Sequence, residues 1–225
     1  MLNSLEMTGR AQTHVAAQED LGCLLAPAAA AALREMRLAA ASEGIDLAVV
    51  SGYRDFQRQL AIWNAKFRGE RPLSDRNGEP VEARTLSAAQ RVDTILLWSA
   101  LPGASRHHWG TDFDVIDRAH LAPGYSVRLS QDEYAPGGLF HALTEWLDAN
   151  MHRFGFFRPY RIDRGGVQPE AWHLSYAPAA VPILEMLTIE ALEDALIGAP
   201  IEGREVLLAR LPELHARFVV GVDKP

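Results

Sequence analysis

Apolar residues recur at helical spacing in several segments of the chain, and short apolar runs separate these segments. The spacing predicts a helix over residues 27–44, because Pro27 suits a first turn and Gly44 a C-terminal cap. The β-branched run 45–50 is short and bounded by Ser-Gly, which is typical of a buried strand. A second helix is predicted from Asp55, a suitable N-cap, to about Phe67.

The rest of the chain mixes helices with short strands. Further helices are predicted over residues 87–99, 138–151, 181–196 and 204–218, and strands over 111–117, 154–160 and 171–176. Residues 68–85 and 118–136 are rich in turn formers and predict loops, the second with a short strand at 125–129. Because regular βαβ alternation is missing, we expect an α+β fold with a small, mainly antiparallel sheet flanked by helices.

Length and composition indicate how this fold is divided. The 225 residues, 48% of them hydrophobic and 23% charged, are typical of a globular chain with a sizeable core. We expect a core over residues 1–180, with N-terminal helices, and a C-terminal helical extension over 181–225 that packs on the core. The leucines of the extension, such as Leu192 and Leu211, recur at helical spacing. A dimer surface or a lid beside the cleft are the alternatives for this extension.

Charge and cysteine content exclude some classes of protein. The net charge of -7 argues against nucleic-acid binding, which depends on clustered lysine and arginine. The single cysteine, Cys23, excludes an internal disulfide and a cysteine-based metal site. The least polar run, residues 23–33, is too short to span a membrane, and the polar first twenty residues show no secretory signal. The cellular compartment therefore stays open.

Three short segments carry residues suited to catalysis: SRHHWGTDFD at 105–114, EAWH at 170–173 and SGYR at 51–54. Imidazole and carboxylate are good zinc ligands, and catalytic zinc has three protein ligands and one open position. Two histidines and an aspartate would meet this need, with Glu170 close enough to act as a general base. Asp112 and Asp114 share one face of the predicted strand, so the spacing leaves both open. The other histidines, among them His108, are interpreted as surface or hydrogen-bonded core residues.

Together, S-x-H-x-x-G-x-x-x-D, E-x-W-H and the upstream S-G-Y-R resemble the D-alanyl-D-alanine carboxypeptidase (VanY-like, peptidase M15) family over about residues 24–180. The resemblance implies an M15-type zinc peptidase with one Zn²⁺ per chain, bound by His107, Asp114 and His173. It therefore favours Asp114 over Asp112. It also implies that Glu170 is catalytic and that Arg54 binds a substrate carboxylate.

Three further residues are expected in the substrate-binding site: Gln59, Ser105 and Trp172. Gln59 falls where the family often has a glutamine, Ser105 can donate a hydrogen bond, and Trp172 can form a wall of the pocket. Two residues depart from the family pattern. Asp112 replaces a small residue and adds a charge near the metal, and Asp55 is expected to pair with Arg54.

The expected function is hydrolysis next to D-amino acids in peptidoglycan stem peptides, most simply as a D-alanyl-D-alanine carboxypeptidase. The expected partner is a stem peptide or another peptide ending in D-Ala-D-Ala. An L,D-carboxypeptidase, a D-Ala-D-Ala dipeptidase and an L-Ala-D-Glu endopeptidase would share the metal centre and differ in how the loops at 68–85 and 118–136 close the cleft. A non-catalytic wall-binding domain is the alternative from another class of protein.

Overall fold

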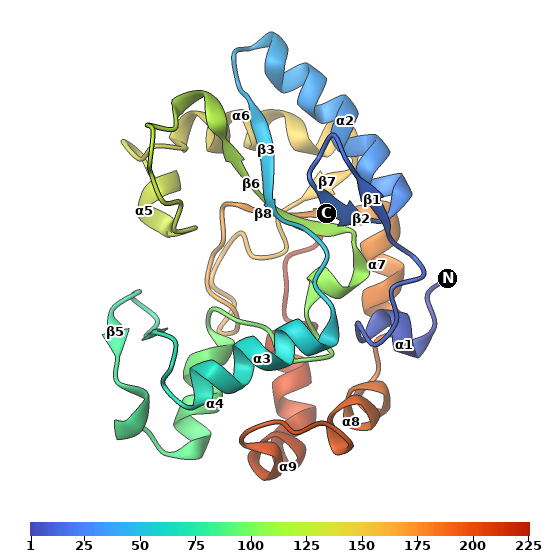
Figure 1. Cartoon of the computed structure of the whole chain (residues 1–225), viewed down its shortest axis with the longest axis vertical. Coiled ribbons are helices and arrows are strands. Elements are labelled where there is room, and N and C mark those ends of the chain that lie inside the picture. The colour runs from blue at the N-terminus through green and yellow to red at the C-terminus, as the bar shows by residue number, and fades with distance from the viewer.

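The computed structural model describes all residues from 1 to 225 (Figure 1). The helices are α1 (Ser4–Met7), α2 (Pro27–Ser42), α3 (Phe56–Phe67), α4 (Ala88–Leu96), α5 (Gln131–Tyr134), α6 (His141–Asn150), α7 (Ala177–Met186), α8 (Ile189–Ile197) and α9 (Arg204–Leu214). The strands are β1 (Ala16–Gln18), β2 (Cys23–Leu25), β3 (Leu47–Ser51), β4 (Leu73–Ser74), β5 (Pro80–Val81), β6 (Asp112–Asp117), β7 (Phe156–Phe157) and β8 (His173–Tyr176). No helix is both long enough and apolar enough to cross a membrane.

A four-stranded sheet organises the molecule. Its strand order is β3-β6-β8-β7, and every neighbouring pair is antiparallel. All six residues of β6 are buried because this strand has a neighbour on each side and packing on both faces. The predicted α+β class with a small, mainly antiparallel sheet is confirmed. The hairpins β1–β2 and β4–β5 form two separate two-stranded sheets.

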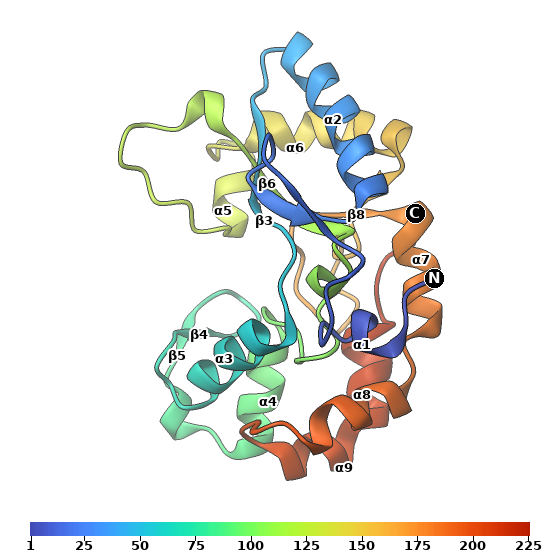
Figure 2. The ribbon, with the colours of Figure 1, turned by 45° about the vertical axis from the view of Figure 1, so that its right-hand side comes forward.

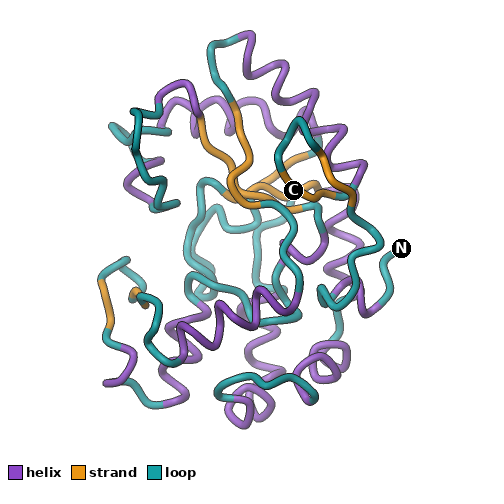
Figure 3. The backbone as a smooth tube through the Cα atoms, viewed as in Figure 1, coloured by secondary structure: helices purple, strands orange, loops and turns teal.

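Two hydrophobic cores lie on opposite sides of the segments that carry the three sequence motifs. The first joins the sheet to α2 and α6, with Leu33 and Phe113 fully buried. The second joins α3 and α4 to the C-terminal helices α8 and α9, with Trp63 fully buried and Leu211 nearly so. Figure 2 shows α2 and α6 at one end of the molecule and α3, α4, α8 and α9 at the other. The segments that run between the two ends are largely loops (Figure 3).

The C-terminal residues contain one more helix than the sequence predicts. The single helix expected over residues 181–196 is wrong: α7 ends at Met186 and α8 begins at Ile189. Thr188 lies between them and caps α8 by accepting a hydrogen bond from the Ala191 amide at 3.3 Å. The break lets α8 turn back and pack against α9.

The loop segments also differ from expectation. The strand expected at 125–129 is wrong, because this stretch folds around the buried carboxylate of Glu133. That carboxylate accepts hydrogen bonds from the Tyr125 hydroxyl at 2.8 Å and from the amides of Arg128 and Ser130 at 3.1 Å. Residues 68–85, expected to be only a loop, contain the β4–β5 hairpin.

The N-terminal segment wraps around the loop that precedes β6. The Trp109 indole donates to the Met7 carbonyl at 3.1 Å, and His14 Nε2 lies 2.8 Å from the His108 carbonyl oxygen. The Ala26 amide donates to the Gly110 carbonyl at 2.8 Å. These contacts anchor the motif of residues 105–114 to residues far from it in the sequence.

Candidate active site

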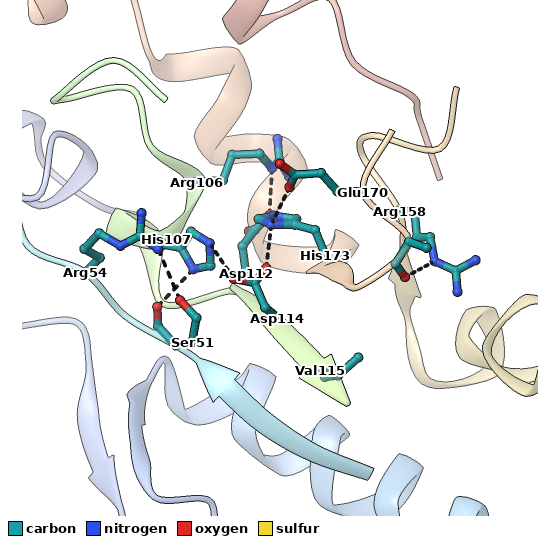
Figure 4. Close-up of polar contacts among 12 residues, drawn as sticks. Ser51, Arg54, Arg106, His107, Asp112, Asp114, Val115, Arg158, Glu170 and His173 are labelled. Carbon is teal, nitrogen blue, oxygen red and sulfur yellow. Dashed lines mark hydrogen bonds and ion pairs between the residues drawn. The ribbon is translucent and has the colours of Figure 1, made fainter. Parts of the chain in front are cut away.

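Three residues from the sequence motifs converge between the two cores. Asp114 on β6 and His173 on β8 are direct partners in the antiparallel register, so their side chains lie side by side on one face. A single 3₁₀ turn, Arg106–Trp109, brings His107 to the same place. One potential ligand atom from each of the three residues lies within 4.8 Å of the other two (Figure 4).

The orientation of the two imidazole rings suits binding of a cation. His107 donates from Nδ1 to the Gly52 carbonyl at 3.0 Å, which leaves Nε2 at 3.5 Å from Asp114 Oδ2. His173 presents Nδ1 to Asp114 Oδ1 at 3.1 Å and to Glu170 Oε2 at 3.6 Å. Two imidazole nitrogens and one carboxylate, all buried, form a donor set that fits a divalent cation such as zinc.

Asp112 is adjacent to this cluster but does not belong to it. Its Oδ1 accepts from Arg106 Nε at 2.7 Å, and its Oδ2 accepts from the Thr111 hydroxyl at 2.7 Å. Oδ1 also lies 3.2 Å from His173 Nε2, on the side of the ring opposite Asp114. The ambiguity between the two aspartates is thus resolved by their partners: Asp114 faces both histidines, whereas the oxygens of Asp112 are already engaged.

Burial and hydrogen bonds set the protonation of the two histidines. It lowers the pKa of His107 to about 3, so this imidazole is neutral at physiological pH. Burial also disfavours the charged form of His173, but hydrogen bonds to Asp112 and Asp114 outweigh it and raise the pKa to about 9. In the metal-free chain His173 is therefore protonated on both ring nitrogens at neutral pH, and a cation bound at Nδ1 would displace the proton there.

Glu170 lies beside His173 and is largely buried, with its side chain 13% exposed. Desolvation raises the pKa of its carboxyl to about 7, although the nearby His173 opposes the shift. Its amide donates to the Tyr160 carbonyl at 2.9 Å, which fixes the backbone before β8. A carboxylate whose pKa is close to neutral is suited to accept and return a proton.

Arg54 lies at the start of α3 and lines the same cleft. Its guanidinium donates to Gln59 Oε1 at 2.8 Å and to the Ser51 hydroxyl at 3.2 Å. The expected pairing of Arg54 with Asp55 is wrong. Asp55 instead caps α3 by accepting from the Arg58 amide at 2.7 Å, because a carboxylate there satisfies a free helix amide.

The three expected substrate-binding residues are placed differently from one another. Ser105 and Trp172 line the cleft, and Trp172 also packs against Tyr134 in the first core. Gln59 is fully buried and does not reach the cleft surface. Its amide nitrogen donates to the Ala100 carbonyl at 2.6 Å, so it holds Arg54 in place from behind.

The cleft has a volume of about 720 Å³, and its lining includes His107, Asp114 and His173. Both segments that the sequence marked as cleft-closing loops contribute to its walls. Ser74, Asn77 and Gly78 come from the β4–β5 hairpin, and residues 128–132 come from the segment before α5 and from the start of that helix. Such a cleft is open enough to accept an extended peptide.

Two buried residues near the site were not expected to support it. Arg106 pairs with Asp112 and donates to the Ser175 hydroxyl at 2.6 Å. His108 is a hydrogen-bonded core residue, as interpreted from the sequence, but its Nδ1 donates to the Arg54 carbonyl at 2.6 Å and its Nε2 accepts from the Gly103 amide at 3.1 Å. Only the fold brings these partners together, so no local pattern could identify them.

A model of a known protein family matches most of the chain, from residue 22 to residue 179, and its description is VanY: D-alanyl-D-alanine carboxypeptidase. The chain belongs to this family. Membership makes it a peptidoglycan peptidase of the VanY type, and the resemblance inferred from its motifs is confirmed.

Curated relatives agree with this family. An uncharacterized protein of Haemophilus influenzae is 35% identical over 122 residues, covering 53% of this chain and 93% of the relative. A D-alanyl-D-alanine carboxypeptidase of Enterococcus faecalis is 29% identical over 147 residues, covering 64% of this chain and 45% of the relative. The chain therefore spans less than half of the Enterococcus protein.

Solved structures show the same fold. VanYB in complex with D-alanine-D-alanine superposes with a TM-score of 0.54 at 24% identity, covering 84% of this chain and 91% of the other. A mutant of the vancomycin-resistance D,D-pentapeptidase VanY in complex with Zn(II) gives a TM-score of 0.52 at 23% identity, covering 87% and 90%. The M15-type architecture expected from the sequence is confirmed.

Proposed function

We propose that this chain is a zinc-dependent D-alanyl-D-alanine carboxypeptidase that acts on peptidoglycan stem peptides. The observation that carries the proposal is the convergence of His107, Asp114 and His173 in the lining of one cleft, with the carboxylate of Glu170 beside His173. Three protein ligands leave a position for water or substrate, which is typical of catalytic rather than structural zinc.

Each ligand in this proposal is held by the protein before any cation binds. His107 is fixed by its hydrogen bond to Gly52, and Asp114 is fixed in the centre of the sheet on β6. One zinc ion held by these groups supplies a Lewis acid that polarises the scissile carbonyl and acidifies a water molecule.

Glu170 is the proposed general base and acid. Its carboxylate takes a proton from the attacking water and returns it to the amine of the departing D-alanine. Burial raises the pKa of Glu170 to about 7, which brings its proton affinity close to what this exchange requires. Tyr160 and Trp172 line the same cleft as Glu170.

Arg54 is the proposed determinant of carboxypeptidase action. A guanidinium binds a free carboxylate through paired, charge-assisted hydrogen bonds. Gln59 and Ser51 hold the guanidinium of Arg54 in one orientation at the wall of the cleft. A peptide that places its C-terminal carboxylate there presents its last peptide bond to the catalytic residues. Ser105, at the base of the cleft, is a further proposed contact for the substrate.

The test is mass spectrometry of a stem pentapeptide ending in D-Ala-D-Ala after incubation with the protein, with chelator and then with added zinc. We expect loss of one alanine, abolished by the chelator and restored by zinc. Glu170→Gln should keep zinc and lose turnover, whereas the matched control Glu35→Gln, at an exposed position of α2, should keep both.

Substrate specificity is tested with the tetrapeptide and with a C-terminally amidated pentapeptide in parallel reactions. Arg54→Ala should raise KM for the free pentapeptide, while Arg58→Ala, exposed on the same helix, should leave KM unchanged. Cleavage of the tetrapeptide but not of the pentapeptide would show that the chain is an L,D-carboxypeptidase and not a D,D-carboxypeptidase. Equal cleavage of the amidated peptide would contradict carboxylate recognition by Arg54 and favour an endopeptidase.

A further inference from the structure

Both ring nitrogens of His173 face carboxylates, and the two carboxylates have different surroundings. Nδ1 faces Asp114 at 3.1 Å, inside the proposed metal cluster. Nε2 faces Asp112 at 3.2 Å, outside it. Asp112 is fully buried and lies two residues before Asp114 on the same strand face, so β6 places one carboxylate on each side of the ring (Figure 4).

The carboxylate of Asp112 is rigidly held. Arg106 Nε donates to Oδ1 at 2.7 Å, and the Thr111 hydroxyl donates to Oδ2 at 2.7 Å. The guanidinium of Arg106 is itself fixed by the Ser175 hydroxyl at 2.6 Å and lies over the Trp109 ring at 4.7 Å. An acceptor fixed in this way can define the orientation of the imidazole in front of it.

We propose that Asp112, fixed by Arg106, is a positioning residue that holds His173 in the tautomer and ring orientation needed to bind the metal through Nδ1. The inference rests on the proposed zinc site. A hydrogen bond from Nε2–H to a carboxylate leaves the Nδ1 lone pair free for a cation, and it makes the ring a stronger donor. Arg106 balances the negative charge of Asp112, so the carboxylate does not add an uncompensated charge beside the metal.

The test compares the zinc affinity of variants by competition with a chromophoric chelator. Asp112→Asn removes the negative charge, and because Oδ1 also accepts from Arg106 Nε, the amide oxygen stays toward His173 Nε2 as a weaker, neutral acceptor. We expect zinc to bind about 10–100-fold more weakly than to the unmodified chain. Asp117→Asn is the matched control, because it makes the same change at another buried aspartate of β6, whose carboxylate accepts from the amides of Asp46 and Ala119.

A second variant separates positioning from stability. Asp112→Ala alone would leave the buried guanidinium of Arg106 without its carboxylate and destabilise the fold. The double change Arg106→Met with Asp112→Ala removes both charges and keeps an apolar side chain against Trp109. This double variant should unfold cooperatively on heating, as a folded protein does, and should bind zinc about 10–100-fold more weakly than the unmodified chain.

A spectroscopic readout reports the hydrogen bond directly. In the zinc-loaded protein, the Nε2 proton of His173 should give a downfield NMR signal that is absent in His173→Ala. The signal should move upfield in Asp112→Asn and in the double variant, and stay in place in Asp117→Asn. A change in overall stability would not move it selectively.

Two results would overturn the inference in distinguishable ways. If Asp112→Asn and the double variant bind zinc within threefold of the unmodified chain and keep the downfield signal, Asp112 has no positioning role and the proposed zinc site stands. If the unmodified chain binds no zinc, the proposed function and the inference both fall.

Discussion

Replacing Gly110 by alanine tests whether the close approach of the N-terminal segment shapes the loop that carries His107. Gly110 ends the 3₁₀ turn that carries His107, and its φ of 64° lies in the left-handed region. A Cβ added there would lie 2.3 Å from Val15 Cγ1 and 2.9 Å from the Ala26 amide nitrogen. The Ala26 amide donates to the Gly110 carbonyl at 2.8 Å, so the backbone at Ala26 cannot move away without breaking this hydrogen bond.

The expected cost has two parts. A left-handed conformation costs a residue with a Cβ about 1–2 kcal/mol. Overpacking a buried position costs roughly a further 1–3 kcal/mol. We therefore expect Gly110→Ala to lower the free energy of unfolding by about 2–5 kcal/mol. Because His107 and Asp114 flank this turn, zinc affinity should fall as well.

Gly78 provides the control. Its φ of 82° is also left-handed, but a Cβ there meets nothing within 4 Å. Gly78→Ala should therefore cost only the conformational part, about 1–2 kcal/mol. Urea denaturation of both variants in the metal-free state measures the difference. Equal losses of stability in the two variants would refute the argument that contact with Val15 and Ala26 requires glycine at 110.

Three further predictions concern pH and metal. Burial lowers the pKa of His108 to about 4, below its value in the unfolded chain. The neutral form of His108 therefore contributes to the free energy of unfolding above pH ~6.5, and roughly 3 kcal/mol of this contribution is lost as the pH falls toward 4. His108→Gln should flatten this slope in urea titrations from pH 4 to 7, and an unchanged slope would assign it to other groups. Burial raises the pKa of Glu170 to about 7, so ionisation of this carboxyl lowers the free energy of unfolding as the pH rises from ~4.5 to 7. Glu170→Gln should therefore stabilise the metal-free protein at pH 8 by up to about 3 kcal/mol. No gain in thermal or urea stability would contradict that buried environment. Zinc at a hundredfold excess over its dissociation constant should add about 2.7 kcal/mol of stability, and calorimetry should show no such gain in Asp114→Asn if that residue is a ligand.

Local features of the sequence were sufficient to predict the main elements. Pro27 begins α2, Asp55 caps α3 and Ser87 caps α4, each through a preference that acts within one helical turn. The strand pair that carries Asp114 and His173 was predicted from short runs of hydrophobic and aromatic residues. Residue chemistry indicated which types of side chain could bind zinc, and the resemblance of the three motifs to a known family implied which of them do.

The sequence by itself thus determined the class of fold, most helices and the family to which the chain belongs. The tertiary structure decided which residues support that chemistry. The contact of Asp112 with His173 and the hydrogen bond from Arg106 to Ser175 join β6 and the turn before it to β8 across some sixty residues. The tertiary structure also decided the register between β6 and β8 and the contacts of the N-terminal segment with Gly110. These contacts depend on which surfaces meet when the cores form, and a periodic pattern within one segment carries no information about its distant partners.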